Sequence, residues 1–324
     1  TATAASDIRL DTQITLIVAN STVAGSIVVT ELDSLVIASM IAASGPVTVT
    51  AGGSITDDSD LSADVIADVL TATATGGIRL DTTVGKLTLT STLSGAIEIR
   101  ETDGVTIETI TTQNGPITLT AAGTIQGGVI KSSATDSGLN TITLTSTSGD
   151  IVVGLVEAGS VNDVVLTAGV GKVVDTNDVD ADVVADRLMV TAAGMISLDT
   201  TVATANLTST VAGQVRLTET DAITLESVTA QNGAVVVTAG GSITATVVST
   251  IATDSGVNSI TLTSLNGSLF IGVVNAGAQN DVTLSAVAGD IVDDVDTAVD
   301  VVADRLLATA GFKLRLDTTV TSVS

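Results

Sequence analysis

The sequence predicts an all-β protein, a parallel β-solenoid, on three observations. A seven-residue marker at 64–70 (Asp-Val-Ile-Ala-Asp-Val-Leu) returns in closely similar form at 182–188 and again at 300–306, each time after 118 residues. Short runs between the markers alternate apolar and polar residues, and the 3.6-residue spacing of amphipathic helices is nearly absent. A fixed long period built from short strands is typical of repeat architectures.

The marker belongs to a larger recurring unit. An acidic run precedes each copy, and Leu-Asp-Thr-Thr follows it at 80–83, 198–201 and 316–319. The clearest strand-like runs lie at 87–90, 117–120, 142–145, 164–167, 235–238, 260–263 and 282–285. Their Val, Ile and Thr residues suit a pleated surface with one buried face, and Gly, Asn and Asp between them supply turns.

These runs divide one unit into five coils, at 68–85, 86–113, 114–138, 139–160 and 161–185. Residues 8–55 match 78–125 at an offset of 70, so the first unit has lost about two coils of about 24 residues. A stack of layers in which each contacts only its neighbours tolerates such a loss. We therefore expect one continuous solenoid over 1–324 of about 14 coils, with a five-coil super-repeat of 118 residues and units 1–67 (shortened), 68–185, 186–303 and 304–324 (partial).

Composition excludes several classes of function. The chain has 36 acidic and 11 basic residues, for a formal net charge of −25, which argues against nucleic acid and against anionic membranes. Mean hydropathy is positive at +0.57, but no run of 18 apolar residues exists, so we expect no membrane insertion. Without His or Cys, and with two Phe as the only aromatic residues, the chain lacks the usual catalytic groups, and we expect no enzyme.

The acidic runs before the markers are the strongest candidate site. Their density of hard oxygen ligands suits Ca²⁺, although the spacing fits neither an EF-hand nor a calcium-binding nonapeptide repeat. A solvated acidic loop is the alternative. The candidate ligands are Asp57, Asp58, Asp60, Asp175, Asn177, Asp178, Asp180, Asp293, Asp294 and Asp296. No other cofactor is expected.

Threonine pairs form a second pattern. Thr-x-Thr occurs at 88–90, 118–120, 143–145 and 261–263, on the outward face of the predicted strands. Regular arrays of this kind are known from ice-binding solenoids, which makes ice binding a remote alternative. Asn206 and Val236 interrupt the array in later coils, and Thr also suits any exposed strand.

Coil alignment predicts one set of ion pairs. If the register is kept, Arg79 lies against Glu98 and Asp81 lies against Arg100. Such exposed pairs contribute less than about 1 kcal/mol each.

The repeats at 115–125 (Gly-Pro-Ile-Thr-Leu-Thr-Ala-Ala-Gly-Thr-Ile) and 233–243 resemble those of filamentous-haemagglutinin-like surface proteins. The segments at 198–202 and 219–225 also resemble those of giant repetitive exoproteins of environmental Gram-negative bacteria. The resemblance implies a right-handed parallel β-helix, secretion to the cell surface or beyond, and a role as an adhesin shaft or extracellular fibre.

The resulting expectation is a structural segment of a bacterial surface fibre. Its expected partner is itself, end to end or laterally, or further repeats of the same polypeptide, because open strand edges favour pairing. A Ca²⁺-stabilised surface binding or adhesion module is the alternative function.

Overall fold

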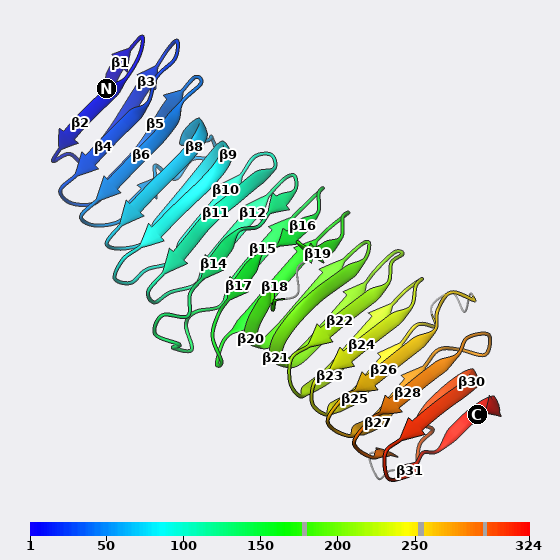
Figure 1. The fold of residues 1–324 in the computed structure, drawn as a ribbon. Coiled ribbons are helices and arrows are strands. Elements are labelled where there is room, and N and C mark those ends of the chain that lie inside the picture. The colour runs from blue at the N-terminus through cyan, green and yellow to red at the C-terminus, as the bar shows by residue number, and fades with distance from the viewer. Residues whose placement is uncertain (177–179, 252–255, 294–296) are drawn as a thin grey trace. The chain divides into compact units, whose positions relative to one another are not determined.

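The computed structural model describes residues 1–176, 180–251, 256–293 and 297–324. The chain divides into two compact units, Thr1–Val165 and Leu166–Ser324. Each is built of parallel coils, as Figure 1 shows for the first unit in blue to green and for the second in green to red. The predicted right-handed parallel β-helix is confirmed as an all-β parallel solenoid of about 15 turns, with strands about 21 residues apart.

Short strands make up nearly all regular structure of the first unit. They are β1 (Ala2–Ala4), β2 (Ile8–Thr12), β3 (Leu16–Ser21), β4 (Ile27–Glu31), β5 (Leu35–Ala42), β6 (Pro46–Ala51), β7 (Ile55–Asp57), β8 (Val65–Ala74), β9 (Ile78–Ser91), β10 (Ile97–Glu101), β11 (Val105–Thr112), β12 (Ile117–Ala121), β13 (Ile125–Gln126), β14 (Val129–Lys131), β15 (Ile142–Ser146), β16 (Ile151–Val153) and β17 (Leu155–Glu157). The boundary between the units falls within β18 (Asp163–Ala168).

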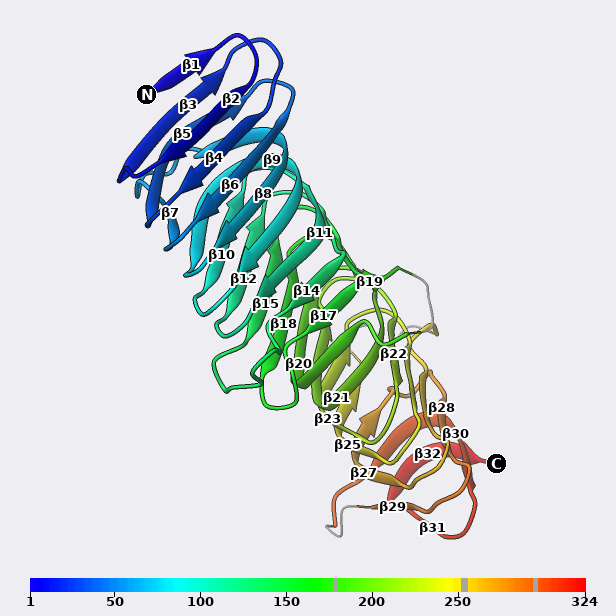
Figure 2. The same cartoon turned by 60° about the vertical axis from the view of Figure 1, so that its left-hand side comes forward.

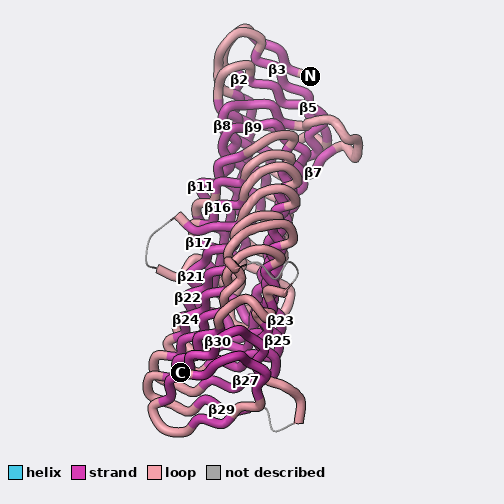
Figure 3. The backbone as a smooth tube through the Cα atoms, turned by 90° about the vertical axis from the view of Figure 1, so that its right-hand side faces the viewer, coloured by secondary structure: helices cyan, strands magenta, loops and turns pink. Residues whose placement is uncertain are grey.

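The second unit repeats the same pattern. Its strands are β19 (Val173–Asp175), β20 (Val183–Ala192), β21 (Ile196–Ser209), β22 (Val215–Glu219), β23 (Ile223–Ala230), β24 (Val235–Ala239), β25 (Ile243–Ser249), β26 (Ile260–Ser264), β27 (Leu269–Asn275), β28 (Val282–Ala286), β29 (Ile291–Asp293), β30 (Val301–Ala310), β31 (Leu314–Arg315) and β32 (Thr318–Val323). Figure 3 shows strands joined by loops and no helix in the traced parts of the chain. Accordingly, the described residues contain no helix long and apolar enough to cross a membrane.

The core is a set of ladders in which like residues stack from coil to coil. In the first unit Ile78 lies against Ile97, Ile97 against Ile117, and Ile117 against Ile142. All four are fully buried, while their neighbours along each strand point outward. Figure 2 shows the corresponding strands β9, β10, β12 and β15 along this unit. Successive residues of each strand therefore point alternately into the core and toward the outer surface.

The 118-residue unit contains about five and a half turns rather than five. In the second unit Ile196 pairs with Val215 of the next turn. The same column of paired residues continues through 235, 260 and 282 to Leu306, which lies five turns after Ile196. Leu314, which is 118 residues after Ile196, lies instead above Ile291. Equivalent residues of successive copies therefore lie on different columns of stacked strands.

Two stacked glycines show why one corner requires Gly. Gly95 and Gly115 adopt φ angles of +147° and +149°, which side-chain-bearing residues rarely adopt. A Cβ atom on Gly115 would lie 2.5 Å from the carbonyl oxygen of Gly95. The coils approach too closely here for any larger residue.

The predicted register at Arg79 is confirmed, but its ion pair differs. Arg79 lies opposite Glu98 and Asp81 lies opposite Arg100. Asp81 and Arg100 approach to 3.8 Å, whereas Arg79 pairs with Asp57 of the preceding coil at 2.6 Å. The acidic run before the marker supplies a closer carboxylate than Glu98.

The ladder makes a prediction about stability. Replacing Ile117 by Ala leaves a cavity between two buried isoleucines and should destabilise the fold by about 2–5 kcal/mol. Thr118→Ala, on the outward face of the same strand, should change stability by less than about 0.5 kcal/mol. Thermal unfolding, with amide hydrogen exchange of β10, β12 and β15, measures both. Equal effects of the two substitutions would contradict the ladder.

Candidate functional site

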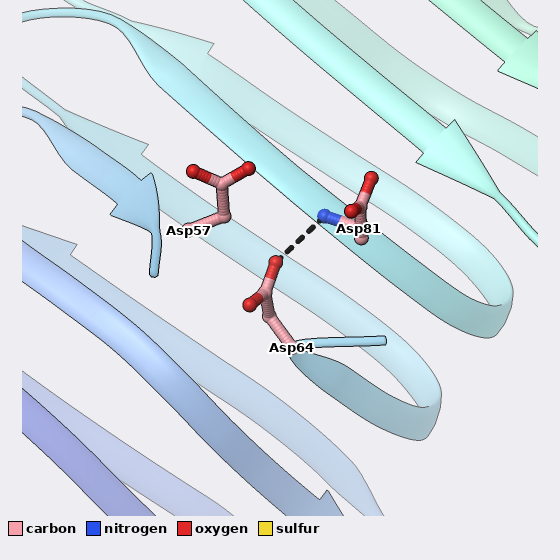
Figure 4. Close-up of side chains that lie close together, drawn as sticks. All are labelled: Asp57, Asp64 and Asp81. Carbon is pink, nitrogen blue, oxygen red and sulfur yellow. Dashed lines mark hydrogen bonds between the residues drawn. The ribbon is translucent and has the colours of Figure 1, made fainter. Parts of the chain in front are cut away.

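Three aspartates from three stretches of the first unit converge beside the first marker. Asp57 ends β7, Asp64 immediately precedes β8, and Asp81 lies on β9. One carboxylate oxygen from each lies within 4.8 Å of the others. Figure 4 shows Asp57 and Asp64 on the side of β9 that carries Asp81. Only the first of these three was predicted as a ligand.

Asp64 is buried because it replaces part of a strand. β7 stops at Asp57 and β8 starts at Val65, so the chain leaves the column between them. The Asp64 N–H donates to the carbonyl of Asp81 at 2.7 Å, and the Asp81 N–H donates back to Asp64 Oδ2 at 2.7 Å, the dashed line in Figure 4. From the coil below, the Met40 N–H donates to the Asp64 carbonyl at 2.6 Å. The carboxylate thus satisfies a backbone donor that the interrupted strand cannot reach.

The same arrangement occurs in both later copies. Asp175, Asp182 and Asp199 form one cluster, and Asp293, Asp300 and Asp317 form the other, each within the same 4.8 Å limit. Their backbone bonds repeat, since Asp199 N donates to Asp182 Oδ2 at 3.0 Å and Asp317 N donates to Asp300 Oδ2 at 2.6 Å. The middle aspartates are 2%, 1% and 1% exposed in the three copies. The interrupted strand and its buried aspartate therefore recur in all three copies of the repeat.

Burial controls the charge of the first cluster. It raises the pKa of Asp64 to about 7, against the hydrogen bond from the Asp81 backbone, and the charges of Asp57 and Asp81 raise it further. Burial also raises the pKa of Asp81, while the Arg100 guanidinium lowers it. Near neutral pH burial therefore favours the protonated, uncharged form of Asp64.

Arginine already supplies positive charge to two of the three clusters. Arg79 donates two hydrogen bonds to Asp57 Oδ1, at 2.6 and 3.2 Å, and Arg315 Nη2 donates one to Asp293 Oδ1. Both stand one residue after the start of the strand above the acidic run. Ser197 occupies this place in the middle copy, opposite Val174.

The predicted ligands divide into three groups. Asp57, Asp175 and Asp293 lie in the clusters. Asp58 and Asp60 are exposed and shape the turn, because Asp58 accepts from Asp60 N and Asp60 accepts from Ser62 N, and Asp180 is also exposed. Asn177, Asp178, Asp294 and Asp296 lie outside the described residues.

Sequence reasoning missed the other two members of each cluster. Asp64, Asp182 and Asp300 open the three markers, and Asp81, Asp199 and Asp317 stand in the Leu-Asp-Thr-Thr segments. Both segments were recognised as repeat markers, and Asp81 was also predicted to lie against Arg100, but neither segment was assigned to the candidate ligands. Their recurrence with every acidic run was the signal that could have identified them.

A second set of buried carboxylates lies one coil higher. Glu101 accepts from Thr82 Oγ1 at 2.8 Å and from Val84 N at 3.2 Å, and Glu219 accepts from Thr200 Oγ1 at 2.7 Å and from Val202 N at 3.1 Å. Burial raises the pKa of Glu101 and of Glu219 to about 7, although the threonine hydroxyls lower it. The recurring Glu-Thr-Asp segments at 101–103 and 219–221 were the available signal.

A polar cleft adjoins the first cluster, and a corresponding cleft lies in the second unit. The first has a volume of about 240 Å³ and is lined by carboxylates and two arginines, among them Asp57, Asp60, Arg79, Asp81, Glu98 and Arg100. The second, of about 340 Å³, includes Asp199, Arg216 and Glu219. Both can hold water and small ions, and neither has the apolar lining usual in small-molecule sites.

No family model, no curated protein and no solved structure matches this chain. The structure itself is a β-solenoid of repeating coils.

The buried glutamates predict how stability depends on pH. Glu101 and Glu219 have folded-state pKa values of about 7, above the unfolded value of about 4.3. Between these values the folded chain binds protons that the unfolded chain has lost, so their contribution is complete below about pH 4 and is lost as the pH rises through 7. The melting temperature should therefore fall between pH 5 and pH 8.

Variants test whether these residues cause the slope. Glu101→Gln with Glu219→Gln keeps one acceptor oxygen at each position and removes the charge, and it should flatten the dependence and raise the melting temperature at pH 8 relative to its value at pH 5. Glu98→Gln, at an exposed position, should leave the slope unchanged. A melting temperature that rose up to pH 8 in the parent protein would contradict the assignment.

Proposed function

We propose that the chain is a structural, non-catalytic segment of an extracellular or cell-surface bacterial fibre or adhesin shaft, as in the filamentous-haemagglutinin-like proteins that it resembles. The observation that carries the proposal is the register of the ladders. Ile97, Ile117 and Ile142 stack residue for residue, and Val235, Ile260 and Val282 do so in the second unit. Such a stack gains length by adding coils, without needing a new core.

Parallel pairing of strand edges supports self-association, because an exposed strand edge can pair with another chain. β32 pairs with β30, and β1 pairs with β3, each in parallel register. Leu314 is 49% exposed, whereas Ile196 at the same place in the preceding copy is fully buried. The proposed partner is a second copy or further repeats of the same polypeptide, which would continue the ladder.

Electron microscopy and sedimentation test this proposal. The protein should form rods or filaments whose length increases with concentration. Leu314→Lys should shorten them, because a charge at an open edge opposes strand pairing. Leu93→Lys, at a loop position that is 67% exposed, is the matched control and should not. Particles of one fixed size at all concentrations, in both the parent protein and Leu93→Lys, would reject self-association.

A Ca²⁺-stabilised module is the second candidate, favoured by the convergence of three carboxylates in every unit. Ca²⁺ takes six to eight oxygen ligands, and carboxylates with backbone carbonyls and water supply them in proteins. The middle cluster differs from the other two in sequence, because it has Ser197 where Arg79 and Arg315 stand beside them. We propose that Ca²⁺ binds at Asp175, Asp182 and Asp199.

The chain supplies matched variants for this test. Calorimetric titration with Ca²⁺ should show binding to the parent protein, and Ser197→Arg should abolish it by placing a guanidinium at the cluster. Arg79→Ser should add a further site at Asp57. Absence of heat in both the parent protein and Arg79→Ser would reject the metal, without affecting the fibre proposal.

A further inference from the structure

Threonines form a two-column array on one face of the first unit. The pairs Thr48 and Thr50, Thr71 and Thr73, Thr88 and Thr90, and Thr109 and Thr111 lie on β6, β8, β9 and β11. Thr48 lies against Thr71, Thr71 against Thr88, and Thr88 against Thr109. The second members align in the same order. Figure 1 shows the four strands in sequence along the blue and cyan part of the chain.

A β-bulge keeps the fourth strand in the array. The register shifts between Ile107 and Thr109, so that Thr109 rather than Glu108 lies against Thr88. The displaced Glu108 pairs with Lys86 at 3.2 Å beside the array. Without the extra residue a carboxylate would stand in the column. The bulge therefore preserves an uncharged surface in a chain whose net charge is −25.

Most of the array hydroxyls are not used by the protein. In the described residues Thr48, Thr50, Thr71, Thr73 and Thr109 make no side-chain hydrogen bond to protein atoms. Thr111 reaches Thr90 only at 3.5 Å, and Thr88 reaches Glu108 at 3.4 Å. Corner threonines differ, since Thr22, Thr92 and Thr147 donate to backbone carbonyls. All eight array residues are half-buried or exposed, so their hydroxyls are left to water.

The array is regular in two directions. Parallel strands place equivalent residues about 4.8 Å apart between coils and about 6.6 Å apart along a strand. These distances are comparable with the oxygen repeats on faces of ice. Each position presents one methyl and one hydroxyl group, and χ1 is restricted because Thr is β-branched.

We propose that the first unit binds ice through the threonine array on β6, β8, β9 and β11. The methyl groups exclude water from the interface and the unused hydroxyls hold first-layer waters at lattice positions. This function is independent of the fibre and Ca²⁺ proposals.

The second unit provides a natural contrast on the same backbone. There Met189 lies against Asn206, and Asn206 against Ser227, where the first unit has Thr71, Thr88 and Thr109. The neighbouring column is retained as Thr191, Thr208 and Thr229. The register and even the bulge, now between Ala205 and Asn206, are the same. One column alone does not form a two-dimensional lattice.

This contrast defines the test. The gap between the freezing and melting points of an ice crystal is measured in the parent protein and in the triple variant Thr71→Met, Thr88→Asn and Thr109→Ser. These residues already occupy equivalent strands, so the variant should fold, which circular dichroism checks. We expect shaped crystals and a measurable gap in the parent protein, and loss of most of the gap in the variant.

Two further variants sharpen the result. Met189→Thr with Asn206→Thr and Ser227→Thr should create a second array and widen the gap. Thr143→Tyr, outward-facing on β15 and outside the array, should leave the gap unchanged. Unmodified crystals with the parent protein, or a full gap in the triple variant, would overturn the proposal. The proposal would also be overturned if the triple variant sedimented differently from the parent protein but kept the same gap. That result would indicate that a second copy of the chain covers the array.

Discussion

Register between parallel coils is the constraint on which this structure depends. The backbone groups of one coil find their hydrogen-bond partners mainly in the coils before and after it. Each strand must therefore align with two neighbours at once, and like side chains stack as a consequence, as Ile97, Ile117 and Ile142 do. Where the chain leaves the column, something must replace the missing bonds. Asp64 does so with its carboxylate, and the bulge at Glu108 restores alignment by adding a residue.

Using a carboxylate as a backbone partner has an electrostatic cost. A buried anion with few bonds is unstable, which is why the pKa of Asp64 is raised to about 7. The clusters show two responses to this cost. Arg79 and Arg315 place a guanidinium against the outer aspartate, while the middle copy has Ser197 at that position. Arginine and a proton are therefore alternative ways to offset the same buried charge, and the proposed Ca²⁺ would be a third.

The sequence was sufficient for the strands and for local alignment. Period-two runs such as 117–120 located β12, and matching of neighbouring coils placed Asp81 against Arg100. The sequence was insufficient wherever the pairing of two strands depends on an irregular segment between them. The approach of Asp64 to Asp81 depends on how the chain rejoins its column after residues 58–63, which no local pattern specifies. Likewise, the stacking of Thr109 on Thr88 depends on a bulge, and the five and a half turns of the unit depend on counting columns rather than runs.

The half turn has a consequence for the acidic clusters. In the second unit the cluster at Asp175, Asp182 and Asp199 and the cluster at Asp293, Asp300 and Asp317 are five and a half turns apart and lie on different columns. At about 4.8 Å per turn their separation along the stack is about 26 Å, more than twice the Debye length of about 10 Å at 0.1 M salt. Mutual repulsion between the clusters is therefore largely screened. Each cluster can gain or lose a proton or a cation without altering the next, so replacement of arginine by serine in one copy leaves the charge balance of the other intact.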